Sequence, residues 1–150
     1  TWSMDHTLSL MILPMLKQLK NDKHGAPLVD DKDVPVELRS TSAPKKKNKH
    51  DTDDNHFKRW DWVLDEMIWA FEQKVDPEEG RSNYYDPYKP NEKVEVTNII
   101  HPSLSEEALA EHTEMMRKMG KFNRTKYKKY MQRKQKALTL FGKYFEALWD

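Results

Sequence analysis

Residues 117–136, RKMGKFNRTKYKKYMQRKQK, carry ten Lys or Arg side chains and no carboxylate. Phe122, Tyr127 and Tyr130 are interleaved with these cations. Cations neutralise phosphates and release their counterions, while aromatic rings offer faces on which nucleobases stack. The stretch therefore predicts a nucleic-acid-binding helix, although a solvated face of a structural helix is the competing interpretation. The candidate contact residues are Lys121, Arg124, Lys126, Tyr127, Lys128, Lys129, Arg133 and Lys136.

Histidine and carboxylate side chains at helical spacing are the second group of residues that could carry chemistry, as ligands of a metal ion. Asp53 and His56 are three residues apart and share one face of a predicted helix, and Glu111 and His112 lie on another. Helical bundles assemble metal sites from such side chains, but a di-iron bundle needs paired Glu-x-x-His motifs and this sequence has none. Helix caps and surface ion pairs are the competing interpretation of these residues. We therefore expect neither a metal nor another cofactor.

Nucleophilic catalysis finds no support in the sequence. The chain has no cysteine, no Gly-x-Ser-x-Gly turn, and only four glycines, which are too scattered to form a phosphate-binding loop. His112 lies within a predicted apolar stripe, where a histidine is more often a hydrogen-bonded core residue than a ligand or base. These observations favour a protein that is not an enzyme.

The segment 53–74, DDNHFKRWDWVLDEMIWAFEQK, is predicted to be the helix at the centre of the core. At 100° per residue, seven apolar side chains fall on one narrow face, and Trp62 and Trp69 form a second stripe one heptad apart. A helix that is apolar on two faces is usually packed between neighbours, so both tryptophans are expected in the core. We expect Asp53 or Asp54 to cap this helix. The narrow face consists of Phe57, Trp60, Leu64, Met67, Ile68, Phe71 and Val75.

Two further helices complete the predicted fold. The first spans about residues 5–20, and Pro14 within it predicts a kink or a late start because proline lacks a backbone N–H. Ser103 and Glu106 form a capping box that starts the last helix, which we expect to break near Gly120. The apolar stripe of the first helix is Leu8, Met11, Ile12, Met15, Leu16 and Leu19. That of the last is Leu104, Ala108, His112, Met115, Met119 and Phe122, then Tyr127, Tyr130, Met131, Leu138, Phe141, Tyr144, Phe145 and Leu148.

Long connections separate the three helices. Residues 24–52 and 77–102 are rich in proline and turn formers, and we expect an ordered arm to about Ser40 and mobility over 42–52. Alternating apolar residues over 94–99 allow one short strand. The prediction is an all-α fold, a single domain of three long helices with long extended connecting segments. The residues expected to anchor the arm are Leu28, Val29, Val34, Val36 and Leu38.

Charge is unevenly distributed along the chain. Charged residues make up 34% of the sequence and the mean hydropathy is −1.00, so much of the chain must stay in water. Residues 1–50, 51–116 and 117–150 carry net charges of +3, −11 and +9. Such blocks either attract one another within the fold or form separate surfaces for partners. No apolar run reaches the roughly 18 residues that a membrane span needs, so we expect a soluble, intracellular protein without a membrane partner.

Six segments carry a resemblance: WSMDHTL at 2–8, LPMLKQLK at 13–20, HGAP at 24–27, VPVELRST at 34–41, HFKRWDWVLDEMIWAFEQK at 56–74 and LFGKYFEALWD at 140–150. They resemble an uncharacterised family of tailed-bacteriophage and metagenomic phage proteins. The resemblance implies a phage protein located in the cytoplasm of an infected bacterial cell or in the virion, and it implies no activity, cofactor or catalytic residue. Family members extend upstream of the Trp2 motif, so we expect a truncated chain or a short member.

Three functions are compatible with these features. The first is a non-enzymatic accessory protein that acts by protein interaction or self-association through exposed aromatic residues. The second is nucleic-acid binding by 117–136, which requires a positive face that the acidic central helix does not cover. The third is a metal-dependent nucleotide hydrolase, which requires several carboxylates in one cleft. The predicted protein contacts are Trp62, Trp69, Tyr84, Tyr85 and Tyr88.

Overall fold

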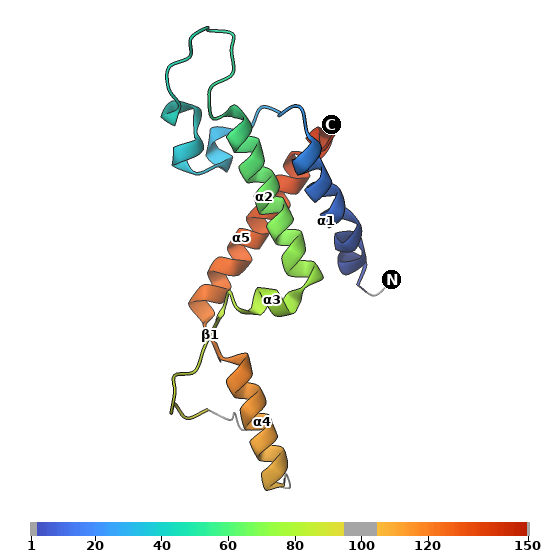
Figure 1. Cartoon of the computed structure of the whole chain (residues 1–150), viewed down its shortest axis with the longest axis vertical. Coiled ribbons are helices and arrows are strands. Elements are labelled where there is room, and N and C mark those ends of the chain that lie inside the picture. Colours follow the sequence, from blue (N-terminus) through green and yellow to red (C-terminus); the bar gives the residue numbers. More distant parts are fainter. Residues whose placement is uncertain (1–2, 95–104, 150) are drawn as a thin grey trace. The chain divides into compact units, whose positions relative to one another are not determined.

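The computed structural model describes residues 3–94 and 105–149 (Figure 1). The described chain is mostly helical, as the sequence predicts, and it divides into two compact units. Unit 1 comprises residues 3–77 and 133–149, and unit 2 comprises residues 78–94 and 105–132. Helix α5 contributes residues to both units. That the whole chain is a single domain stays a prediction.

Within the described residues, four helices of at least 14 residues are found where three were predicted. The predicted last helix is two helices, because Gly120 ends the first of them with a φ of +84°. None of the described helices is long and apolar enough to cross a membrane. In chain order the elements are α1 (Met4–Asp22), the 3-10 turns η1 (Asp31–Asp33), η2 (Val36–Leu38) and η3 (Ser40–Ser42), α2 (His56–Val75), α3 (Pro77–Arg81), β1 (Tyr85–Asp86), α4 (Glu106–Met119), β2 (Lys121–Phe122), α5 (Arg124–Lys143) and the 3-10 turn η4 (Phe145–Ala147).

The core of unit 1 is built around α2, as predicted. Trp60, Val63, Leu64 and Met67 are at most 1% exposed, and their spacing of three, one and three residues places them on one face of the helix. The ring of Trp60 meets Tyr144 edge to face at 5.9 Å, and Phe71 meets Phe141 at 5.0 Å, so the C-terminal half of α5 packs against α2. Phe57, which was assigned to the same apolar face, is half exposed because it lies in the first turn of α2.

Helix α1 runs antiparallel to α2 and binds it with a row of ion pairs. Lys17 meets Glu72 and Lys23 meets Asp61, each at 2.6 Å, and Lys20 meets Asp65 between them. The lysines are three residues apart, so successive cations stay on the side of α1 that faces α2. The acidic residues of the central helix are therefore neutralised largely by the first helix, rather than by the basic last helix.

The path of α1 corrects two details of the prediction. The helix starts at Met4 and continues through Pro14, so a late start is wrong. Its six-residue apolar stripe is divided between two faces: Leu16 is buried and Ile12 and Leu19 are half-buried against the core, whereas the other three are exposed. The exposed residues are Leu8, Met11 and Met15.

The first connection forms an ordered arm with three 3-10 turns. Val29 and Val34 are buried in the core of unit 1, as predicted, but Leu28 and Val36 are exposed and do not anchor the arm. The hydroxyl of Tyr144 donates to the Asp33 carboxylate at 2.7 Å and accepts from an arm N–H at 3.1 Å. These two hydrogen bonds of Tyr144 connect the arm to the C-terminal part of the chain. Mobility over 42–52 stays a prediction.

A buried ion pair fixes the start of α2. Arg59 donates to both oxygens of the Asp53 carboxylate, at 2.8 and 2.7 Å, and also to the carbonyl of Leu38 at 3.2 Å. The two side chains are only 5% and 9% exposed. The expected capping role of Asp53 or Asp54 is wrong: Asn55 occupies the N-cap position and makes no side-chain cap bond there. Asp53 is occupied by Arg59 instead, and Asn55 donates to carbonyls of the arm.

Unit 2 contains a two-stranded antiparallel sheet, in which Tyr85 pairs with Phe122 and Asp86 with Lys121. Helix α4 begins at Glu106, and the side chain of Ser105 accepts from the N–H of Ala108 as its N-cap. The predicted capping residue Ser103 and most of the predicted strand at 94–99 lie outside the described residues. No residue of α4 is buried, so its predicted core stripe is wrong.

The variant Asp53→Asn tests the buried ion pair through its pH dependence. The Arg59 guanidinium lowers the pKa of Asp53 from 3.8 to about 2. The lowered pKa stabilises the fold above about pH 4, and this contribution is lost as the pH falls through about 2. We expect the wild type to lose about 2 kcal/mol more unfolding free energy than the variant between pH 5 and the acid limit.

The same variant leaves Arg59 buried without a carboxylate, so at pH 7 it should be less stable than the wild type by about 3 to 5 kcal/mol. Urea titrations followed by circular dichroism at several pH values measure both effects. Parallel pH profiles for the wild type and the variant would contradict this assignment.

Candidate functional site

The two tryptophans of the second stripe lie beneath cations of α5. Arg133 binds both oxygens of Glu66 at 3.0 and 2.7 Å, and its guanidinium lies 3.8 Å from the ring centroid of Trp69. The ammonium of Lys136 lies 5.2 Å from the ring centroid of Trp62. Both tryptophans are half-buried. These contacts give Arg133 and Lys136 structural roles within unit 1, although both were predicted to bind nucleic acid.

Two other predicted cations are held by carboxylates within unit 2. Lys121 pairs with Glu92, and Lys126 pairs with Asp86. Asp86 also accepts from the side-chain amide of Asn123 at 2.7 Å. Lys126 first, and then Asn123, lower the pKa of the Asp86 carboxyl. These pairs connect the two strands to the first turn of α5.

Three predicted cations remain at the surface of α5. Arg124, Lys128 and Lys129 are exposed, and none forms an ion pair with another described residue. Arg124 and Lys128 are one helical turn apart and therefore share a face. Next to them in the chain, the rings of Phe122 and Tyr127 are 53% and 38% exposed. This combination of free cations and partly exposed rings is the part of the predicted nucleic-acid site that the fold brings together.

The predicted tyrosine contacts belong to an aromatic cluster in unit 2. The ring of Tyr84 lies 5.0 Å from Tyr130, 5.2 Å from Tyr127 and 5.3 Å from Tyr85. Burial raises the pKa of the Tyr130 hydroxyl. Tyr88 lies under cations, 5.4 Å from Lys121 and 5.9 Å from Arg117. Tyr84, Tyr85 and Tyr88 are half-buried within unit 2, and their role in protein contacts stays a prediction.

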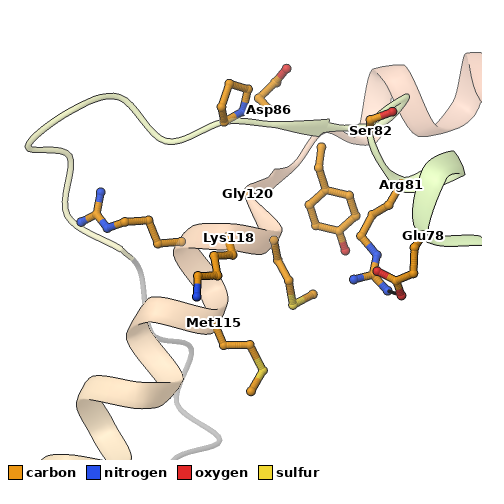
Figure 2. Close-up of a pocket in the computed structure, with 11 residues that line it drawn as sticks. Glu78, Arg81, Ser82, Asp86, Met115, Lys118 and Gly120 are labelled. Atoms are coloured by element: carbon orange, nitrogen blue, oxygen red, sulfur yellow. Dashed lines mark hydrogen bonds and ion pairs between the residues drawn. The ribbon is translucent and has the colours of Figure 1, made fainter.

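A pocket of about 580 Å³ opens beside the strands of unit 2. Figure 2 shows Met115 and Lys118 of α4 on one side of it, and Glu78 and Arg81 of α3 on the other. Arg81 donates to Glu78 at 2.7 Å, which neutralises that wall. Gly120, where α4 stops, also lines the pocket. With its carboxylates paired, this pocket offers no evident general acid or base.

An apolar groove of about 410 Å³ lies on unit 1. All three long helical segments of this unit line it, and sequence analysis missed it because no single segment contains it. Its only charged lining residues are Asp5, Lys74 and Lys134. Burial, and secondly the charge of Lys74, lower the pKa of Lys134. The apolar lining consists of Leu8, Ile12, Ala70, Phe71, Leu138 and Phe141.

An exposed apolar stripe on α1 borders this groove. Met4, Leu8, Met11 and Met15 are 63%, 44%, 61% and 67% exposed. Their spacing of four, three and four residues places them in one row along the helix. The sequence contained this signal, but the same pattern was interpreted as part of the core. Leu8 belongs to both the stripe and the groove.

The weak metal candidates are engaged elsewhere or lie apart. Asp53 is held by Arg59, and the buried His56 places its Nε2 3.2 Å from the carbonyl oxygen of Ala26. Glu111 is exposed on α4 and His112 is half-buried. Across residues 3–94 and 105–149, no group of three or more His, Asp or Glu side chains could hold a metal ion. The geometry of the described chain does not supply the cleft that a metal-dependent hydrolase requires.

Comparisons with protein-family models, curated proteins and solved structures find no match to this chain. The resemblance to phage proteins stays a prediction. The groove, the exposed stripe of α1 and the exposed cations of α5 are therefore the features of the described chain that bear on function.

The variants Gly120→Ala and Gly142→Ala form a matched pair with opposite expected effects. A Cβ at Gly120 would lie 2.6 Å from the backbone oxygen of Asp86, and its φ of +84° is unfavourable for alanine. We expect this variant to lose about 1 to 3 kcal/mol of stability. Gly142 lies in α5 with nothing within 4 Å, so alanine there should add about 0.5 to 1 kcal/mol. Denaturant titrations measure both, and a stabilising Gly120→Ala would contradict this geometry.

Proposed function

We propose that this protein acts by self-association, as a non-enzymatic interaction protein, and that the exposed stripe of α1 pairs with the same stripe of a second copy. The observation that carries the proposal is the row formed by Met4, Leu8, Met11 and Met15, each more than 40% exposed. The spacing of four, three and four residues is that of the contact positions in paired helices. No charged residue interrupts the row, so a second identical row meets no like charge in it.

The size of the stripe is compatible with a reversible dimer. Fully burying one Met or Leu side chain contributes about 1.5 to 3 kcal/mol, and roughly half of each side chain is still exposed. Eight such side chains from two copies would therefore contribute roughly 6 to 12 kcal/mol. Association costs an estimated 4 to 15 kcal/mol. These opposing quantities are similar, so we expect a dimer whose population depends on protein concentration.

Methionine suits such a surface because its unbranched thioether side chain adapts to the shape of its neighbour. The same row of one copy facing the row of another gives an isologous interface, the commonest kind in homo-oligomers. The aromatic residues that were predicted to make protein contacts support the proposal less well, since Trp62, Trp69 and the tyrosines are half-buried. On the sequence resemblance alone, we also propose that the protein is a phage accessory protein of the infected cell or the virion.

The variant Met11→Lys tests the proposed interface. A lysine in the middle of the row places two like charges between the copies, so we expect the dimer dissociation constant to rise by more than about tenfold, or 1.4 kcal/mol. Met115→Lys is the matched control, because Met115 is 57% exposed but lies on α4, outside the stripe. Sedimentation velocity at several protein concentrations measures both. A wild type that is monomeric throughout, or equal weakening by both variants, would refute the proposal.

Nucleic-acid binding is a second candidate function. It is favoured by the exposed cations Arg124, Lys128 and Lys129, which have no ion-pair partner in the described chain, and by the partly exposed side chains of Phe122 and Tyr127 beside them. These three cations form a small positively charged surface at the start of α5.

The double variant Arg124→Gln/Lys128→Gln tests this second candidate. In fluorescence anisotropy with labelled single- and double-stranded DNA and RNA, log affinity should fall linearly with log salt. Losing two phosphate contacts should reduce that slope by about 1.4 to 1.8. The control Lys45→Gln/Lys46→Gln removes the same charge from the arm and should leave the slope unchanged. Absence of binding at low salt would exclude this candidate.

A further inference from the structure

The groove of unit 1 continues the exposed stripe of α1 onto α5. Leu8 belongs to the stripe and also lines the groove, and Leu138 and Phe141 line it from α5. Phe145 follows in η4, where its ring meets that of Phe141 at 5.7 Å. Leu138 is 40% exposed and Phe145 is 60% exposed. An accessible apolar surface therefore reaches from α1 through the groove to the residues that follow α5.

The charged side chains that line the groove are engaged within the chain. Lys74 pairs with Asp5, and Lys134 also interacts with another part of the chain. The hydroxyl of Ser9, the uncharged polar residue of the lining, donates to the carbonyl oxygen of Asp5 at 2.7 Å. A polar group of an occupant would lose its water without gaining a partner here, and that loss is costly. The groove therefore fits a row of uncharged apolar side chains.

Two rows of the same spacing lie on the helices that line the groove. The rows that start at Leu8 on α1 and at Leu138 on α5 each place apolar side chains at positions i, i+3 and i+7. An amphipathic helix anchors in an apolar groove with side chains at this spacing. Helices whose apolar rows have the same period can interdigitate along their length. The stripe of α1 thus has the spacing of a helix that could occupy the groove of another copy.

We propose that the α1 stripe of a second copy lies in this groove, so that the methionines of each copy contact Leu138 and Phe145 of the other. This inference rests on the proposed self-association and names the surface that completes the interface. The four side chains of the stripe are few beside the roughly 20 to 30 residues and 800 Å² per partner of a specific interface. The groove and Phe145 enlarge the buried apolar area without adding a charge. Methionine side chains are flexible enough to fill its irregular walls.

The variant Leu138→Asp tests whether the groove belongs to the interface. A carboxylate there would be buried against the apolar row of the partner, so we expect the dimer dissociation constant to rise by more than about tenfold. Thr139→Asp is the matched control and should leave the dissociation constant unchanged. Thr139 is exposed, follows Leu138 directly on α5 and does not line the groove. Sedimentation velocity at several protein concentrations measures both variants.

Mixed cross-linking covers the case in which Leu138→Asp does not fold. One protein carries Met11→Cys and an affinity tag, and the other carries Leu138→Cys, so that the mass identifies the mixed dimer. With a short bis-maleimide, we expect this pair to give several-fold more mixed dimer than Met11→Cys with Lys136→Cys. Lys136 is exposed on the same helix but lies over Trp62, away from the groove.

Self-association and the groove contact fail in distinguishable ways. A wild type that is monomeric throughout overturns both. A dimer that Met11→Lys weakens, but that a folded Leu138→Asp leaves unchanged, retains self-association and overturns the groove contact. Equal weakening by Leu138→Asp and Thr139→Asp, or equal yields of mixed dimer from the groove and control pairs, also overturns the groove contact.

Discussion

The burial of α2 is the constraint on which the rest of unit 1 depends. Trp60, Val63, Leu64 and Met67 form one almost inaccessible face of the helix, and Arg59, Glu66 and Gln73 are buried on the flank of that face. One neighbour cannot cover them, so α1, the arm and the C-terminal half of α5 must all pack against α2. The arm is held at the start of α2 by Arg59. This buried cation is tolerable because a carboxylate and a carbonyl accept hydrogen bonds from its two terminal amino groups, although its Nε has no partner in the described chain.

The same arrangement distributes the charges of the molecule. Helix α1 places its lysines against the acidic residues of α2, and these pairs leave the opposite side of α1 to uncharged residues. The exposed Met and Leu side chains of that side border the groove at Leu8. The exposed stripe and the groove are thus both consequences of how α1 packs on α2. The exposed cations of unit 2 arise separately. Glu92 and Asp86 of the second connection pair with Lys121 and Lys126, and the other cations at the start of α5 stay exposed.

Helical periodicity located α2 and its core because its apolar face is continuous, and Gly120 marked the break between α4 and α5. Periodicity could not decide which part of the broad apolar arc of α1 faces the core: Leu16 is buried, whereas Met15, its neighbour in sequence, is 67% exposed. The pairing of Tyr85 with Phe122 could not be predicted from the sequence, because strands of two residues have no recognisable period. The groove could not be predicted either, since Leu8, Phe71 and Leu138 come together only through tertiary packing.

Cross-linking through a single introduced cysteine tests self-association most directly, because the chain has no cysteine of its own. Met11→Cys places one thiol at the middle of the exposed stripe, and Met115→Cys places one on α4 as a reference. With a short bis-maleimide at micromolar protein concentration, we expect covalent dimers of the first protein and almost none of the second. Equal yields from the two proteins, or no dimer from either, would contradict the claim that α1 pairs with a second copy of itself.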